Sequence, residues 1–178
     1  MDKDVQEILY TAQQIRTRVM QLGDTLEIEY ADKNPVFICI LKGSLVFYSD
    51  LIRACNFPLE TQFLRASSYK DKTTTSGVVA ISEQEELNIN GRHVIIVEDI
   101  IDSGITLARI VDMLSEHNPV SIEICTCFDK AECRKVDLQA DYVGFTCPSE
   151  FLVGYGLDFA EKYRNLPYVG ILNSRIYS

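Results

Sequence analysis

The sequence has 178 residues and a formal net charge of −9 at pH 7, so it is expected to form one domain and not to bind nucleic acid, which requires a basic face. Hydrophobic residues make up 47% and charged residues 24% of the chain, a balance that is typical of a soluble globular protein and excludes a disordered one. No apolar run approaches the roughly 20 residues that span a bilayer, and the N-terminus lacks the basic and apolar regions of a signal peptide, so we expect a cytoplasmic protein without membrane contact.

The N-terminal part of the chain predicts a long helix followed by a strand, a turn and a second helix. Apolar residues recur at helical spacing before Gly23, which predicts about five turns of amphipathic helix at the N-terminus; they are Val5, Ile8, Leu9, Ala12, Ile15 and Val19. The apolar run Val36–Leu41 predicts a strand, and a helix is expected from residue 45 to about residue 55. The turn between them is Lys42-Gly43-Ser44.

The next segment predicts two strands joined by a polar loop. Residues 59–66 alternate apolar and polar side chains like a strand, and residues 78–81 are expected to be the returning strand. Residues 67–77 contain almost no apolar side chains, which predicts an exposed, mobile loop.

A second strand-turn-helix unit begins at His93. Residues 93–97 have the β-branched density of a buried parallel strand, and apolar residues recur at helical spacing from Leu107 to Leu114. A tight turn must lie between them. Such a turn at the carboxyl edge of a parallel sheet is where open α/β folds bind ligands, because amides at the helix N-terminus point outward.

The chemistry of this turn predicts a site for a phosphorylated sugar. Successive amides and two hydroxyls can bind a phosphate; they belong to Ser103, Gly104, Ile105 and Thr106. Three acids, Glu98, Asp99 and Asp102, would repel a phosphate at the same spot, so they are expected to face a sugar diol, a metal ion or a proton that is removed.

Three common structural motifs fit this turn less well. A P-loop requires a Gly-Lys pair, and the chain contains none. The dinucleotide-binding motif requires three spaced glycines, but Phe159 stands where the third would follow Gly154 and Gly156. An ordinary N-capped helix accounts for Asp102 or Ser103 but leaves the two preceding acids unexplained.

The remainder of the chain completes an α/β pattern. Strands are expected at residues 120–127 and 142–145, and Val169–Leu172 is expected to close the sheet. The alternation of strands and helices predicts a mainly parallel, Rossmann-like sheet, and the helix-poor C-terminal segment is expected to form a hood over one edge.

The cysteines and histidines predict no zinc site. Most of the six cysteines lie in apolar stretches, as reduced thiols do, so we expect no disulfide. Cys125-x-Cys127 would place both thiols on one face of a strand without a second pair at zinc-binding spacing. His93 at a strand start and His117 at a helix end are expected to be structural.

The acidic turn carries a family resemblance. Two acids, two apolar residues and Asp-Ser-Gly-x-Thr, at residues 98–106, resemble the phosphoribosyl diphosphate (PRPP) motif of the type I phosphoribosyltransferases. The variant that begins at Val97 is similar to the 6-oxopurine branch, the hypoxanthine/guanine phosphoribosyltransferases. The resemblance extends from Phe37 to at least Gly170.

The resemblance implies a fold and a reaction. The fold is a single domain over residues 1–178, with a hood from the N-terminal helix and the C-terminal segment and a mobile lid at about residues 67–77. The reaction is purine salvage, in which the 5-phosphoribosyl group of PRPP is transferred to N9 of hypoxanthine or guanine, giving IMP or GMP and pyrophosphate.

The resemblance also assigns the site. PRPP is expected to bind Glu98, Asp99, Asp102, Ser103, Gly104, Ile105 and Thr106; pyrophosphate to bind Lys42, Gly43 and Arg164; and the purine to bind Lys130, Phe151 and Leu152. Ser68 and Tyr69 match the lid dipeptide, and Asp102 is the expected catalytic base. Ile105 replaces a Lys of some members, so a modest loss of phosphate affinity is expected. In the family, the peptide before the Lys that matches Lys42 is often cis.

Electrostatics favour a divalent cation. A chain with a charge of −9 has no long-range attraction for PRPP, so Mg²⁺ is expected. The family resemblance implies Glu98, Asp99 and Asp158 as its carboxylate ligands. Family members are usually dimers or tetramers, which predicts a homo-oligomer. Two alternatives stay open: a PRPP-sensing regulator without catalysis, and a transferase specific for xanthine or a pyrimidine.

Overall fold

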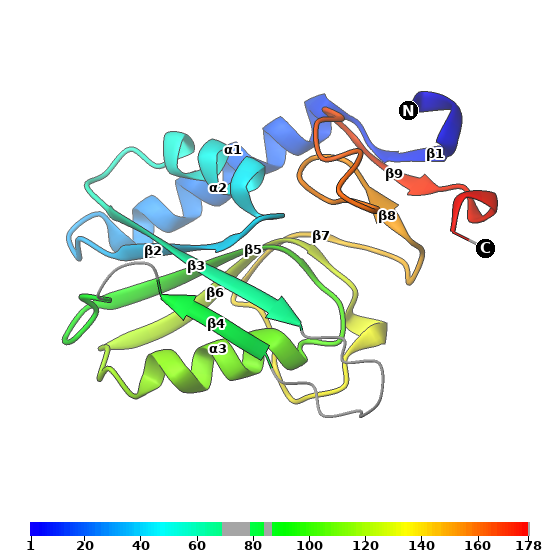
Figure 1. The fold of residues 1–178 in the computed structure, drawn as a ribbon. Helices are drawn as coiled ribbons and strands as arrows, with labels where there is room; N and C mark the ends of the chain where they lie inside the picture. The colour runs from blue at the N-terminus through cyan, green and yellow to red at the C-terminus, as the bar shows by residue number, and fades with distance from the viewer. Residues whose placement is uncertain (69–78, 84–86, 178) are drawn as a thin grey trace.

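Two sheets organise the computed structural model, which describes residues 1–68, 79–83 and 87–177 (Figure 1). Within these residues, the main sheet has six strands in the order β4-β3-β2-β5-β6-β7. Their bounds are β2 (Val36–Leu41), β3 (Glu60–Ser68), β4 (Val79–Glu83), β5 (His93–Ile101), β6 (Ser121–Asp129) and β7 (Tyr142–Thr146). Among the described strand pairs of this sheet, only β3–β4 is antiparallel. The predicted mainly parallel α/β fold is confirmed.

Helices cover both faces of this sheet. Helices α1 (Ala12–Tyr30) and α2 (Leu45–Ala54) lie on one face, and α3 (Ile105–Ser115) lies on the other (Figure 1). Alternate residues of the central strands therefore enter two cores: Phe37, Cys39, Ile95 and Val97 pack toward α1 and α2, whereas Ile38, Ile40, Val94 and Ile96 pack toward α3. Burial on both faces explains why these strands read as unbroken apolar runs.

A smaller antiparallel sheet forms the hood. Its strands, in the order β1-β9-β8, are β1 (Val5–Tyr10), β9 (Val169–Leu172) and β8 (Leu152–Val153). The expectation that Val169–Leu172 closes the main sheet is wrong: the segment is a strand, but it pairs with β1 and β8. Its Leu172 joins Val153 and Leu166 in a separate core beneath the hood. Short 3₁₀ turns lie at Asp2–Asp4, Ala131–Cys133 and Ser174–Ile176.

The predicted N-terminal helix is wrong at both ends. Residues of β1 pair with β9, so this distant partner overrides their helical spacing. The helix starts only after Thr11, which accepts a hydrogen bond from the Gln14 amide in a reciprocal capping box. It continues through Gly23, where an added Cβ would lie 2.6 Å from the Ala54 carbonyl oxygen of α2. Gly23 therefore permits close helix packing and does not end the helix.

The other elements follow the predictions closely. The observed β2, α2, β3 and β7 agree with the expected segments to within about two residues, and β4 is the expected returning strand. Strand β5 runs four residues further than expected, to Ile101, so Glu98 and Asp99 lie within it. The expected mobile loop falls almost entirely outside the described residues. Among the helices of the described ranges, each is too short or too polar to cross a bilayer.

Candidate active site

Three parallel strands end at the edge of the sheet that carries the acidic turn. Strands β2, β5 and β6 are neighbours in parallel register, so Leu41, Ile101 and Asp129 reach the same edge. The hood loop, residues 154–164, meets this edge directly: a Cβ on Gly156 would lie 2.1 Å from the Gly43 carbonyl oxygen. The predicted site residues thus come from distant segments to one edge, as open α/β folds require.

The turn between β5 and α3 forms a small polar pocket of about 140 Å³. It is lined by Glu98, Ile100, Ile101, Asp102, Ser103, Gly104, Thr106 and Leu107. Gly104 caps α3 with φ of 77°, a left-handed conformation that suits glycine. A Cβ there would also lie 2.9 Å from Cδ of Arg134. The pocket joins helix-terminal amides and hydroxyls, which fits a phosphate.

Glu98 and Asp99 form a closely spaced acidic pair beside this pocket. The Asp99 amide donates to Glu98 Oε1 at 3.1 Å, and the Ile100 amide donates to Asp99 Oδ1 at 2.7 Å. Burial and the neighbouring Asp99 charge raise the pKa of Glu98 well above its usual value, and burial raises the pKa of Asp99. A Cβ on Gly43 would lie only 1.7 Å from Asp99 Oδ2. This acidic pair would be stabilised by a cation.

A second pocket, of about 240 Å³, adjoins the first. It is lined by Asp99, Ile100, Asp102, Lys130, Phe151, Leu152, Leu157 and Asp158. Lys130 is only 8% exposed, unlike a solvated surface lysine, and its Nζ lies 3.9 Å from a carboxylate oxygen of Asp102. Phe151 is 38% exposed and stacks on Tyr177 with ring centroids 5.2 Å apart. The predicted purine residues and the predicted base therefore share one pocket.

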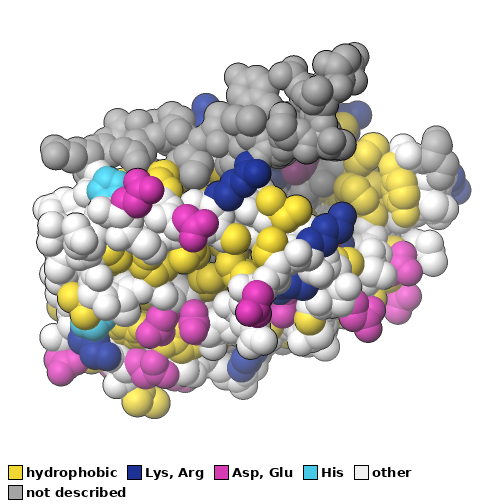
Figure 2. Space-filling model, turned by 90° about the horizontal axis from the view of Figure 1, so that it is seen from below, with side chains coloured by type: hydrophobic (Ala, Val, Ile, Leu, Met, Phe, Trp, Pro, Cys, Tyr) yellow, Lys and Arg dark blue, Asp and Glu magenta, His cyan; other side chains and the backbone are white. Residues whose placement is uncertain are grey.

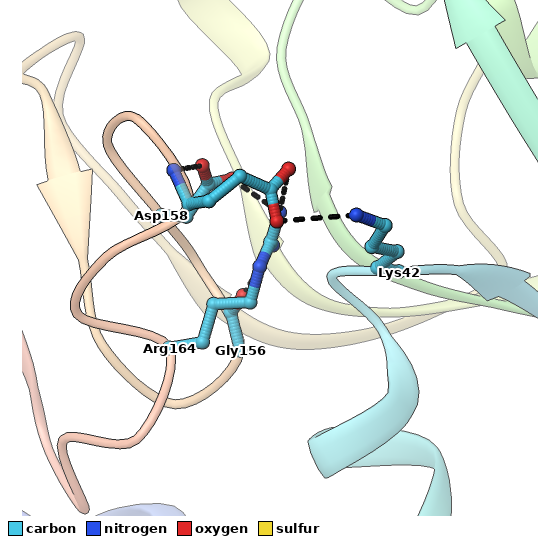
Figure 3. Close-up of polar contacts among 5 residues, drawn as sticks. Lys42, Gly156, Asp158 and Arg164 are labelled. Atoms are coloured by element: carbon cyan, nitrogen blue, oxygen red, sulfur yellow. Dashed lines mark hydrogen bonds and ion pairs between the residues drawn. The ribbon is translucent and has the colours of Figure 1, made fainter.

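The predicted pyrophosphate cations face each other across the cleft (Figure 3). Lys42 follows a cis peptide bond after Leu41. Arg164 donates from Nη1 to the Gly156 carbonyl at 2.8 Å and pairs through Nη2 with Asp158 at 2.8 Å. The Glu161 carboxylate bridges the two cations, at 3.2 Å from Lys42 Nζ and 3.4 Å from Arg164 Nη2. The hydrogen bond from Lys42, and then the charges of the two cations, lower the pKa of Glu161.

The predicted metal ligands do not converge into one cluster. Asp99 and Asp158 line the same pocket, whereas Glu98 lines the adjoining one. Among the described residues, no group of three or more His, Cys, Asp and Glu side chains is arranged to hold a metal ion. A cation at this edge would therefore need oxygens from a ligand or water to complete its coordination.

Several site residues could not be identified from sequence patterns. Ile100 and Leu157 line the purine-side pocket, but apolar residues in such positions carry no chemical signal. Arg134 donates to the Asp102 carbonyl at 2.8 Å and forms an ion pair with Asp129. Arg134 is an isolated arginine four residues after Lys130 and belongs to no recognisable motif. Glu161 likewise belongs to no motif. Of the predicted lid dipeptide, Ser68 ends β3 and Tyr69 lies outside the described residues.

The two pockets share Ile100 and Asp102, so one ligand can extend from the turn between β5 and α3 into the pocket of Lys130 and Phe151. The acidic pair contributes Glu98 to one pocket and Asp99 to the other, and Arg164 pairs with Asp158 of the second pocket. This arrangement suits a reaction at the junction, in which the group held on the cations leaves and the group beside Asp102 enters.

Comparison with known proteins places the chain in one family. The phosphoribosyl transferase domain family matches residues 5–160. The chain is 46% identical over 178 residues to the hypoxanthine-guanine phosphoribosyltransferase of Streptococcus thermophilus, covering 100% of this chain and 99% of that protein. A hypoxanthine phosphoribosyltransferase structure from Staphylococcus aureus has a TM-score of 0.95 at 42% identity and covers 100% of this chain and 97% of its own. A Trypanosoma cruzi hypoxanthine phosphoribosyl transferase has a TM-score of 0.91 at 35% identity, with coverages of 98% and 95%.

Proposed function

The chain belongs to the phosphoribosyl transferase domain family, and from this premise we propose how it performs purine salvage as a hypoxanthine-guanine phosphoribosyltransferase. The enzyme transfers the 5-phosphoribosyl group of PRPP to N9 of hypoxanthine or guanine and releases pyrophosphate. The observation that carries the proposal is the pair of adjoining pockets that share Asp102, one with helix-terminal amides and the other with a buried lysine.

PRPP spans the first pocket and the cationic side of the cleft. Its 5-phosphate binds the amides and hydroxyls of residues 103–106, because the N-terminus of α3 attracts anions. Its ribose hydroxyls donate to Glu98 and Asp99, and its diphosphate binds Lys42 and Arg164. This orientation presents C1 of the ribose to the purine-side pocket.

The purine binds in the second pocket. Phe151 supplies a partly exposed ring for stacking, and the Lys130 ammonium donates to the 6-oxo group. Adenine is rejected because its 6-amino group would face a side chain that can only donate. Asp102 accepts the N7 proton as N9 attacks C1 and the bond from C1 to pyrophosphate breaks.

Magnesium fits the chemistry of the acidic residues. Mg²⁺ binds proteins through one or two carboxylates and completes its shell with substrate oxygens and water, which agrees with a site where Asp99 and Asp158 line one pocket and Glu98 lines the adjoining one. The raised pKa values of Glu98 and Asp99 indicate that a bound cation would stabilise both charged carboxylates. When bound with PRPP, the ion would neutralise the departing diphosphate.

The surface charge supports a small-molecule substrate. On the face seen in Figure 2, acidic and basic side chains of the described residues are interspersed and form no single basic patch. This distribution and the net charge of −9 favour small-molecule substrates over nucleic acid. We assign the enzyme to the cytoplasm as one domain over residues 1–178, with a hood, a lid near residues 67–77 and a homo-oligomeric state.

The test is PRPP-dependent pyrophosphate release with hypoxanthine, guanine, xanthine or adenine, each in Mg²⁺ or EDTA. Metal-dependent turnover of hypoxanthine and guanine is the expected result. Turnover of xanthine alone would favour the xanthine-specific alternative. PRPP binding without turnover of any base would replace the enzyme with a PRPP sensor.

A further inference from the structure

Glu161 occupies the space between the two pyrophosphate cations. Its two carboxylate oxygens are divided between them: Oε2 lies 3.2 Å from Lys42 Nζ, and Oε1 lies 3.4 Å from Arg164 Nη2. Lys42 extends from the turn after β2, whereas Arg164 comes from the hood loop (Figure 3). The carboxylate of Glu161 thus joins the two sides of the cleft.

The backbone around Glu161 holds this carboxylate in place. Phe159 and Lys162 form an antiparallel bridge, with hydrogen bonds of 3.2 and 3.0 Å, so the residues between them form a tight two-residue turn. Ala160 and Glu161 have φ of 52° and 63°, in the left-handed region where glycine or asparagine is the usual choice. The Glu161 amide also donates to Asp158 Oδ2 at 2.9 Å. The turn therefore directs Glu161 toward the cations.

A contribution to folding stability does not explain why a carboxylate lies between these cations. The side chains of Glu161 and Lys42 are 65% and 54% exposed, and that of Arg164 is 26% exposed. Exposed ion pairs contribute little to the free energy of unfolding, because water and salt screen them. Arg164 also retains a shorter pair with Asp158, at 2.8 Å. Loss of Glu161 would thus leave the hood loop attached.

We propose that Glu161 is a built-in competitor of the diphosphate group, a positioning residue that holds Lys42 and Arg164 apart from other anions until PRPP displaces it. This role rests on the proposed function. Both anions bind the same two cations, so a diphosphate competes with Glu161 for the donors of Lys42 and Arg164. The same exchange runs in reverse after the reaction, when the carboxylate returns to the cations and promotes release of pyrophosphate.

The test compares wild-type enzyme with Glu161→Gln, which keeps the side-chain shape and removes its charge. Calorimetric titration with pyrophosphate in Mg²⁺ should show about three- to tenfold tighter binding to the variant, the effect expected from removing two exposed ion pairs. The inhibition constant of pyrophosphate against PRPP should fall by the same factor. The dissociation constant of IMP should not change, since IMP lacks a diphosphate.

Glu116→Gln is the matched control, because it removes the same charge from an exposed site at the C-terminal end of α3. It should leave pyrophosphate binding unchanged. Equal or weaker pyrophosphate binding to Glu161→Gln would overturn the competitor role. Wild-type turnover of hypoxanthine is measured in parallel: its absence rejects the proposed function itself, whereas normal wild-type turnover with unaltered pyrophosphate affinity in the variant rejects only the role of Glu161.

Discussion

Asp102 belongs to both pockets, and this position defines its chemistry. Its side chain is 62% exposed, so its carboxylate is accessible to a ligand in either pocket. Asp102→Asn keeps the size of the side chain but removes the proton acceptor. We expect kcat to fall by about 10²- to 10⁴-fold, the usual contribution of a general base, with PRPP affinity retained. Steady-state kinetics and PRPP titration measure the two effects, and near-normal turnover would eliminate Asp102 as the base.

Lys130 combines burial with a weakly held ammonium group. It is 8% exposed, lies 3.9 Å from Asp102 and lines the second pocket, so its ammonium group is available to a ligand there. Lys130→Met should reduce kcat/KM for hypoxanthine by about 10- to 100-fold, because a hydrogen bond to a charged donor contributes about 1.5–3 kcal/mol.

The PRPP dissociation constant should stay unchanged in the Lys130 variant, which separates loss of base recognition from misfolding. The control is Lys135→Met, an exposed lysine whose backbone amide, at 2.9 Å from the Ser103 carbonyl, makes the local contact. An equal loss of PRPP affinity in Lys130→Met would show that the lysine supports the fold of the site and not the base alone.

At the scale of elements, the segment after β6 supports the phosphate-binding turn. Arg134 donates to the Asp102 carbonyl at 2.8 Å and pairs with Asp129, and its Cδ would lie 2.9 Å from a Cβ added at Gly104. The side chains of this pair are only 13% and 15% exposed. Arg134→Met would leave the Asp129 carboxylate without this ion pair, so we expect the free energy of unfolding to fall by about 1–3 kcal/mol.

Loss of Arg134 should also loosen the turn that holds the 5-phosphate. The KM for PRPP should therefore rise more than the KM for hypoxanthine. Arg134→Lys should restore only part of the PRPP affinity, since an ammonium group lacks the planar fork that reaches both the Asp102 carbonyl and the Asp129 carboxylate. Kinetics with each substrate varied in turn measures this division. A uniform loss in both KM values would indicate general destabilisation instead.

Local sequence patterns correctly predicted the elements that are buried in the main sheet or packed against it. The runs that became β2 and β5, and the helical spacing of α3, gave correct types because burial on both sheet faces leaves a strong sequence pattern. The helix prediction for Val5–Tyr10 was wrong because the apolar spacing of this segment also suits a helix. The strand with which it pairs, β9, lies at the other end of the chain. Pairing over that distance leaves no local signal.

The candidate site shows the same division. The motif at residues 98–106 predicts a phosphate-binding turn with acids beside it, because several chemical features are adjacent in sequence. Glu161 and Arg134 carried no such signal, because each acts through residues brought near by the fold. Ion pairs across a cleft depend on the placement of whole elements, which single-residue chemistry cannot supply.

The buried thiols of the core make the free energy of unfolding of the whole molecule depend on pH in the alkaline range. Cys125 and Cys127 lie in the core under α1 and α2, at 0% and 1% exposure, and burial raises the pKa of both above the usual thiol value of 9.0. In the unfolded chain these thiols ionise near that value. Above it the folded state binds more protons than the unfolded state, so the free energy of unfolding must fall as pH rises.

This sign gives a measurable slope. Each fully buried thiol should lower the free energy of unfolding by about 1.4 kcal/mol per pH unit once the unfolded thiol ionises, between about pH 9 and about pH 11. Cys125→Ala should lose one thiol's share of that slope, even if a cavity lowers its stability at neutral pH. Urea unfolding at several pH values measures both slopes. Parallel slopes for the variant and the wild type would mean that Cys125 does not remain protonated in the folded protein, and that alkaline destabilisation comes from other groups.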